Sequence, residues 1–99
     1  MLRCDIYELT QTELKVRRIS DLAQSEVWFD PRRSHSEKDP IISEMEETTK
    51  KAMAVIEHAI DLVVDGESRH QDVKRVHMRL ETFQDVKKLA DYYLPEYDN

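Results

Sequence analysis

The 99-residue chain has a single glycine and three prolines, so few positions are marked as tight turns. One cysteine excludes an internal disulfide and is typical of a protein from a reducing compartment. No apolar run approaches the roughly 20 residues that a membrane-spanning helix needs, and no signal-peptide pattern opens the chain. We therefore expect a cytoplasmic protein whose residues 1–99 form one domain.

Catalytic and metal-binding patterns are also missing. Glu44 and Glu47 supply one half of the ExxE and ExxD pair with which one all-helical class of nucleotide hydrolases holds a metal, and the second half is absent. His70 and His77 stand seven residues apart, too far along one helix to share an ion, and no HExxH occurs. No nucleophile elbow or glycine-rich phosphate loop is present. We expect neither an enzyme nor a bound metal or other cofactor.

The net charge of −6 is unevenly distributed along the chain. Residues 40–67 carry seven acidic side chains and two basic ones. This negative net charge disfavours direct binding to nucleic-acid phosphates, which needs a basic surface. It leaves open one alternative function, an acidic decoy that occupies a basic or nucleic-acid-binding site on another protein.

Apolar periodicity predicts a long helix over residues 40–65. Asp39 and Pro40 give a start signal, because an aspartate caps free N–H groups and proline suits the first helical position. Gly66 gives the stop signal. Small or apolar side chains recur every three or four residues and so share one helix face: Ile42, Met45, Thr49, Ala52, Ile56, Ala59 and Val63.

A second helix is predicted over residues 68–94. Ser68 and Gln71 match a capping box, and Pro95 ends the pattern. Equal lengths and the short turn between the two helices predict that they pack as an antiparallel hairpin, with Thr49 and Lys87 in one layer. The stripe of this helix consists of Val73, Val76, Leu80, Phe83, Lys87, Ala90 and Leu94.

Residues 1–29 are expected to cover this hairpin, and residues 30–39 to form a linker loop. A short amphipathic helix over residues 11–27 would turn Leu14, Ile19, Leu22, Ala23 and Val27 inward. The predicted fold is therefore mainly all-α, either a three-helix unit or a dimeric four-helix bundle. The alternative is an α+β fold in which residues 2–9 and 14–19 form a β-hairpin, although the turn between them lacks glycine or asparagine.

The segment 52–64 is apolar beyond one stripe, and a helix that is apolar on nearly all sides is buried on nearly all sides. Residues 27–29 form the densest apolar cluster outside the two predicted helices, and they are expected either to anchor the N-terminal segment on the hairpin or to form an exposed aromatic hot spot for a partner. We therefore expect a protein–protein interaction module (an adaptor, regulator or inhibitor) that acts through helix faces, as a homo-oligomer or with another protein. The expected interface consists of Trp28, Phe29, Met53, Val55, Ile56, Ile60 and Leu62.

A small-ligand pocket between the helices of an oligomer is the remaining alternative. Its motive is Lys87, a charged residue at a position that the periodicity assigns to the core. The pocket would be lined by His77, Arg79, Lys87 and Tyr93.

Overall fold

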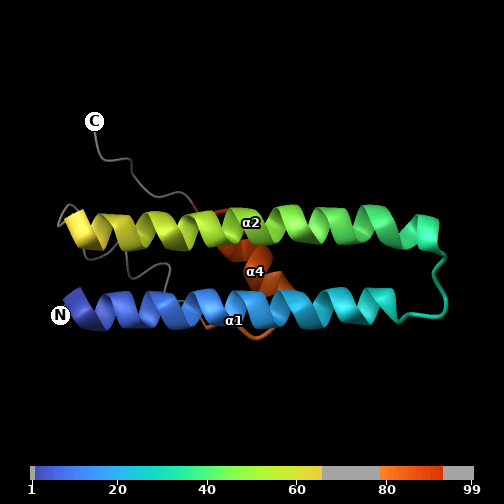
Figure 1. Cartoon of the computed structure of the whole chain (residues 1–99), viewed down its shortest axis with the longest axis horizontal. Helices are drawn as coiled ribbons and strands as arrows, with labels where there is room; N and C mark the ends of the chain where they lie inside the picture. Colours follow the sequence, from blue (N-terminus) through green and yellow to red (C-terminus); the bar gives the residue numbers. More distant parts are fainter. Residues whose placement is uncertain (1, 66–78, 93–99) are drawn as a thin grey trace.

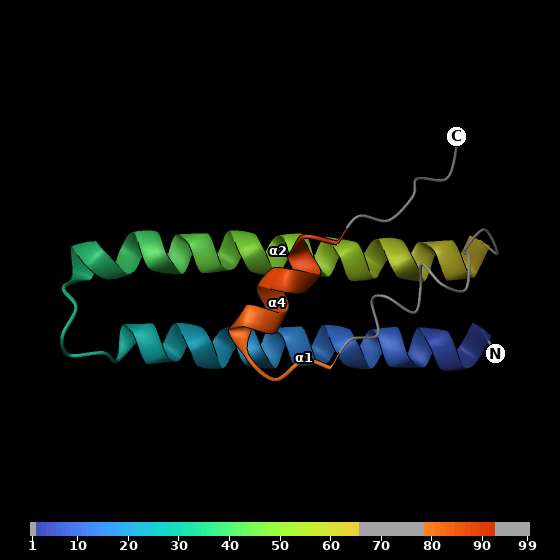
Figure 2. The same ribbon diagram turned by 180° about the vertical axis from the view of Figure 1, so that it is seen from behind.

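The described part of the chain is built from three helices. The computed structural model describes residues 2–65 and 79–92. Its helices are α1 (Leu2–Trp28), α2 (His35–Asp65) and α4 (Phe83–Ala90), and neither described range contains a strand. The all-α prediction is confirmed, and the alternative β-hairpin is wrong. Figure 1 shows α1 and α2 side by side in opposite directions, and Figure 2 shows α4 crossing both on one face.

The long antiparallel pair is formed by α1 and α2, which corrects the predicted pairing of residues 40–65 with residues 68–94. Residues 66–78 and 93–94, which include the predicted turn, lie outside the described residues, and residues 79–82 are not helical. At 27 residues, α1 is long enough to cover most of α2, whereas α4 has 8 residues. The helix predicted over residues 11–27 is confirmed but too short, since α1 begins at Leu2; polar residues, among them the buried Thr12 and Ser20, interrupt its inner face and weaken the signal.

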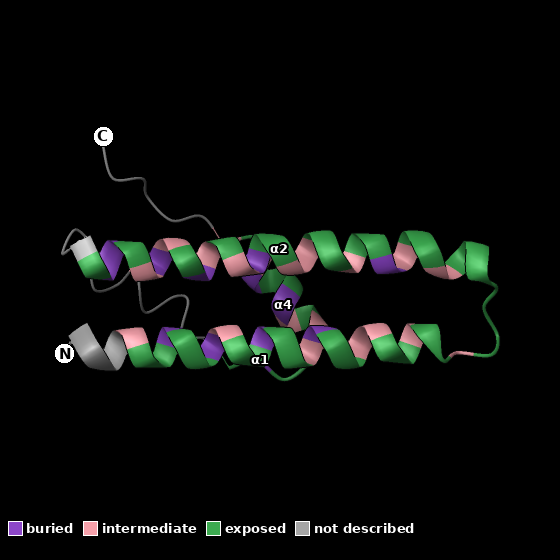
Figure 3. Cartoon of the chain, viewed as in Figure 1, coloured by how far each residue is buried: buried purple, intermediate pink, exposed green. Residues whose placement is uncertain are grey.

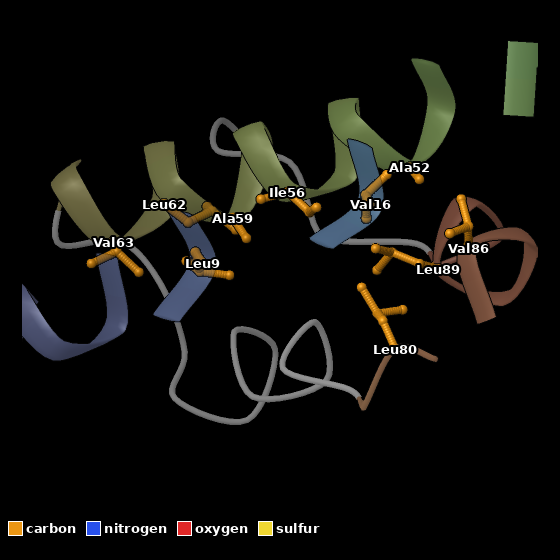
Figure 4. Close-up of a cluster of buried hydrophobic side chains, with 10 residues drawn as sticks. All are labelled: Leu9, Val16, Ala52, Ile56, Ala59, Leu62, Val63, Leu80, Val86 and Leu89. Carbon is orange, nitrogen blue, oxygen red and sulfur yellow. The ribbon is translucent and has the colours of Figure 1, made fainter. Parts of the chain in front are cut away.

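The stripe predicted for α2 is confirmed as its inner face. All seven of its residues are buried or half-buried, and Figure 3 shows the buried residues on the sides where the helices meet. Four of them belong to a core that draws on all three helices (Figure 4). This core consists of Leu9, Val16, Ala52, Ile56, Ala59, Leu62, Val63, Leu80, Val86 and Leu89.

Helix α2 begins at His35, five residues before the predicted start, so the predicted linker over residues 30–39 is too long. Ser34 explains the earlier start, because its hydroxyl accepts from the Glu37 N–H at 3.4 Å and donates to the Glu37 carboxylate at 3.2 Å. The first of these bonds is the one that a serine makes as the N-cap of a helix. Pro40 lies inside the helix near its start, where its ring removes one backbone donor.

A partly buried chain of hydrogen bonds sets the register of α1 against α2. The Ser20 and Thr49 hydroxyls lie 2.6 Å apart, Gln24 Nε2 donates to Ser20 at 3.0 Å, and Thr49 donates to the Met45 carbonyl at 2.8 Å. Each hydroxyl has one proton, so Ser20 donates to Thr49. Thr49 therefore shares its layer with Ser20, and the predicted layer of Thr49 with Lys87 is wrong. Counted from this bond, Leu9 lies level with Ile60 in the antiparallel helix.

The Thr49→Val substitution should lower the free energy of unfolding by about 1–3 kcal/mol, because it leaves the buried Ser20 proton without an acceptor. Removing both hydroxyls with Ser20→Ala and Thr49→Val should cost less than the sum of the single changes. Urea unfolding followed by circular dichroism measures both effects. Strictly additive losses would contradict the coupling of the two hydroxyls.

Candidate functional site

The predicted interface residues of α2 lie mostly inside the molecule. Ile56 and Leu62 are 0% and 4% exposed and belong to the core, so no partner reaches them in this fold. Met53, Val55 and Ile60 are half-buried and pack against the same core. Because α1 covers one side of α2 and α4 packs on another, the surplus apolar surface of α2 is largely covered within the chain.

The aromatic pair at the end of α1 lies at the surface. Trp28 is 39% exposed, and its ring meets the His35 ring edge-on with 5.7 Å between centroids. Lys38 Nζ donates to the Trp28 carbonyl at 2.6 Å, which ties the end of α1 to the first turn of α2. Phe29 is 84% exposed, and its N–H donates to the Ser25 carbonyl at 2.9 Å. This bond continues the helical pattern of α1, so Phe29 extends its surface.

Asp30 organises the turn that follows. Its Oδ1 accepts from the backbone N–H of Arg32 at 3.0 Å and from Arg32 Nε at 3.2 Å, and its Oδ2 accepts from Arg33 Nε at 3.2 Å. The Arg32 N–H, supported by the two guanidinium groups, lowers the pKa of Asp30 from 3.8 to about 2. The carboxylate therefore stays charged and keeps the turn closed well into the acid range.

We expect the Asp30 carboxyl to titrate with a midpoint near 2 in a carbon-13 NMR titration. Because the folded pKa lies below the unfolded value of 3.8, the stabilising contribution is present above pH 3.8 and is lost as the pH falls toward 2. The Asp30→Asn variant should show a smaller loss of thermal stability over this pH interval than the wild type. A midpoint near 3.8 would contradict the hydrogen-bonded turn.

Helix α1 carries a second row of apolar side chains on the side away from its core face. Tyr7, Leu14 and Leu22 are 65%, 52% and 61% exposed. At 3.6 residues per turn they lie on the opposite side of the helix from Leu9 and Val16, which are fully buried. The prediction that Leu14 and Leu22 face inward is therefore wrong, whereas Ile19, Ala23 and Val27 from the same predicted set are half-buried.

We call this row, with the residues between its members, the outer stripe of α1. All of its residues are exposed: Tyr7, Gln11, Leu14, Arg18, Leu22, Ser25 and Phe29. The other long helix has no comparable row, since Val64 is the one large hydrophobic side chain exposed along the described residues of α2. The outer stripe was not recognised from the sequence, although its apolar residues recur at intervals of seven or eight.

A hollow of about 270 Å³ opens beside the outer stripe, where the segment entering α4 approaches α1. Its apolar lining includes Ile19, Leu22 and Phe83, and its polar lining includes Glu26 and Glu81. A smaller hollow of about 190 Å³ lies on another side of Phe83. It is lined by Val27, Ile41, Glu44, Met45, Thr48, Phe83 and Lys87.

The main reason for predicting a ligand pocket, a charged residue in the core, does not hold. His77 and Tyr93 lie outside the described residues, and the side chain of Arg79 is 86% exposed and pairs with Glu81 at 2.7 Å. Lys87 is exposed, with its Nζ 6.0 Å from the centre of the Phe83 ring, so its assignment to a core layer is wrong. The prediction assumed that the apolar spacing continued in one helix from residue 73 to Lys87. In the structure α4 begins at residue 83 after a non-helical segment, so the earlier spacing does not determine which of its residues face the core.

Asp85 explains this new start. Its Oδ2 accepts from the backbone N–H groups of Glu81 and Thr82 at 2.8 and 3.0 Å. The Thr82 N–H is the larger cause of a lowered pKa for the Asp85 carboxyl, followed by the Glu81 N–H. The charged Asp85 thus holds the N-terminus of α4 and with it the wall of the larger hollow.

Within residues 2–65 and 79–92, no three His, Cys, Asp or Glu side chains gather closely enough to hold a metal ion. No helix in the same ranges has both the length and the apolarity to cross a membrane. Comparisons of the chain with models of known families, with curated proteins and with solved structures found no match. The function is therefore inferred from the residues and their geometry.

Proposed function

We propose that this chain is a small protein–protein interaction module that binds through the outer stripe of α1. One observation carries the proposal: Tyr7, Leu14, Leu22 and Phe29 are each more than half exposed along a single helix face. Covering apolar surface contributes about 25 cal/mol per Å², so a row of four such side chains favours a protein contact.

The way α1 is held supports this function. Its other side packs against α2 for most of its length and also contacts α4 (Figure 1), so the outer stripe is presented by an already formed helix. Binding then does not have to offset the entropy of ordering that helix. An adaptor, a regulator and an inhibitor can each use such a preformed helix face.

The Leu22→Glu variant tests the proposal in an extract of the cells from which the chain comes. The tagged wild-type chain should elute in an assembly larger than the monomer, and Leu22→Glu should shift it to monomer size, because a carboxylate in an apolar contact is costly. Ala54→Glu, at an exposed position of α2, is the matched control and should elute like the wild type. Elution of Leu22→Glu in the same assembly as the wild type would overturn the proposal.

A further inference from the structure

We infer that the outer stripe of α1 binds the outer stripe of a second copy of this chain, packed antiparallel across a two-fold axis at Arg18. This inference rests on the proposed function, whose surface it uses. The observation behind it is the order of the outer stripe, whose residues are separated by 4, 3, 4, 4, 3 and 4 positions. Counted from Arg18 toward either end of the stripe, the residues occur at the same intervals and in the same order: aliphatic, polar, aromatic.

A two-fold interface brings one surface against itself, so that surface must be complementary to its own reversed image. Reversal about Arg18 places Leu14 opposite Leu22 of the second copy, and Tyr7 opposite Phe29 of the second copy. Gln11 then meets Ser25 of the second copy, so a polar side chain faces a polar one. Each of these positions is exposed in the single chain. The stripe therefore meets the requirement along its whole length.

The stripe also has the period that two straight helices need. Tyr7, Arg18 and Phe29 are 11 residues apart, which corresponds to about 3.67 residues per turn. This value is close to the 3.6 of an undistorted α-helix, so the stripe winds only slightly around the helix axis. Two such helices stay in contact over about 33 Å without strong supercoiling.

Charges on one flank of the stripe are complementary in this arrangement. Arg18 meets its own copy at the axis, but Asp21 of the second copy lies about 4.5 Å away along the helix, within reach of the Arg18 guanidinium. Arg17 lies on the same flank as Asp21 and comes within one turn of Asp21 of the second copy. Each copy thus supplies one carboxylate near two guanidinium groups of the other.

The other flank brings a lysine to the larger hollow. Lys15 of the second copy lies level with Asp21 of the first, on the flank that carries Leu22 and Glu26. The hollow lined by Leu22 and Phe83 opens on this flank, and it also has Glu26 and Glu81 in its lining. A lysine suits this site, because its aliphatic stem packs on apolar surface while its ammonium group pairs with carboxylates.

Disulfide cross-linking tests both the partner and its direction. In a Cys4→Ser background, mild oxidation of the Arg18→Cys variant should give a covalent dimer, because the two substituted positions meet at the axis. The Gln11→Cys variant should stay monomeric, because its two positions are about 21 Å apart and a disulfide needs Cα atoms within about 7 Å. Cross-linking of both variants would mean parallel helices, and cross-linking of neither would mean another contact; each result would overturn the inference.

Light scattering on the purified full chain gives the second measurement. The wild type and Ala54→Glu should be dimers, and Leu14→Glu should dissociate at least about tenfold more readily with an unchanged helical circular dichroism spectrum. A wild type that stays monomeric at sub-millimolar concentration would overturn the inference. If the extract assembly is still lost in Leu22→Glu, the stripe binds a different protein and the proposed function stands. If Leu22→Glu retains the assembly, the proposed function fails as well.

Discussion

Replacement of Ile56 by alanine should lower the free energy of unfolding by about 2–5 kcal/mol. Ile56 is fully buried in the core where α1, α2 and α4 meet. The substitution removes buried apolar atoms and leaves a cavity that the surrounding helices fill only in part. A small domain is stable by about 5–15 kcal/mol in total, so this one change takes a large share.

Chemical denaturation followed by circular dichroism measures the loss. Val64→Ala, on the same helix at a position that is 62% exposed, is the matched control and should change stability by less than about 0.5 kcal/mol. The two variants also distinguish a core role of Ile56 from an interface role. If Ile56→Ala altered assembly while stability remained at the wild-type level, Ile56 would belong to an interface as the sequence indicated.

Replacement of Leu89 by alanine should cost about 2–5 kcal/mol and release α4 from the rest of the molecule. Leu89 and Val86 are the two buried residues of this 8-residue helix, and Leu89 is 0% exposed. A helix of two turns has little stability of its own in water, so its structure depends on these contacts. Loss of the Leu89 side chain removes one of the two buried side chains that hold it.

Amide hydrogen exchange along α4, measured together with thermal unfolding, reports both effects. Lys87→Ala is the matched control, since Lys87 is exposed on the same helix, and it should change stability by less than about 0.5 kcal/mol. The periodicity of the sequence had placed Lys87 in the core. An equal loss of stability in Lys87→Ala and Leu89→Ala would mean that Lys87 belongs to the core, and it would contradict the observed packing of α4.

The inner face of α2 could be predicted from the sequence because its apolar repeat is long and regular. From Ile42 to Val63 the repeat continues without a charged residue, and a helix with such a stripe must bury it. What the stripe packs against does not follow from it. Apolar residues at helical spacing occur both before and after this stripe in the sequence, and their spacing does not say which segment covers it.

The inner face of α1 was predicted only in part, because its signal is weak. Glu13 and Ser20 stand between the buried Leu9 and Val16 and the half-buried Ala23, so the apolar repeat is broken. The start of α2 was placed late for a related reason. Asp39 with Pro40 is a strong start signal, and the serine N-cap at Ser34, five residues earlier, was not recognised.

The candidate site was predictable only in part. Trp28 and Phe29 were recognised because aromatic residues beside a polar loop stand out, and they do lie at the surface. Tyr7, Leu14 and Leu22 also form a helical row in the sequence. A helix with two apolar rows can turn either one inward, and only packing decides which row is covered.

The position of α4 across both long helices has a consequence for the order in which the molecule assembles. Its buried side chains rest on a surface to which α1 and α2 both contribute (Figure 4). That surface exists only once the two long helices have met, so docking of α4 is the later event. During unfolding, α4 can detach while α1 and α2 stay packed together. Separation of α1 from α2, in contrast, also removes the surface on which α4 packs. Opening therefore has a direction: α4 can leave the pair first, but the pair cannot separate without also displacing α4.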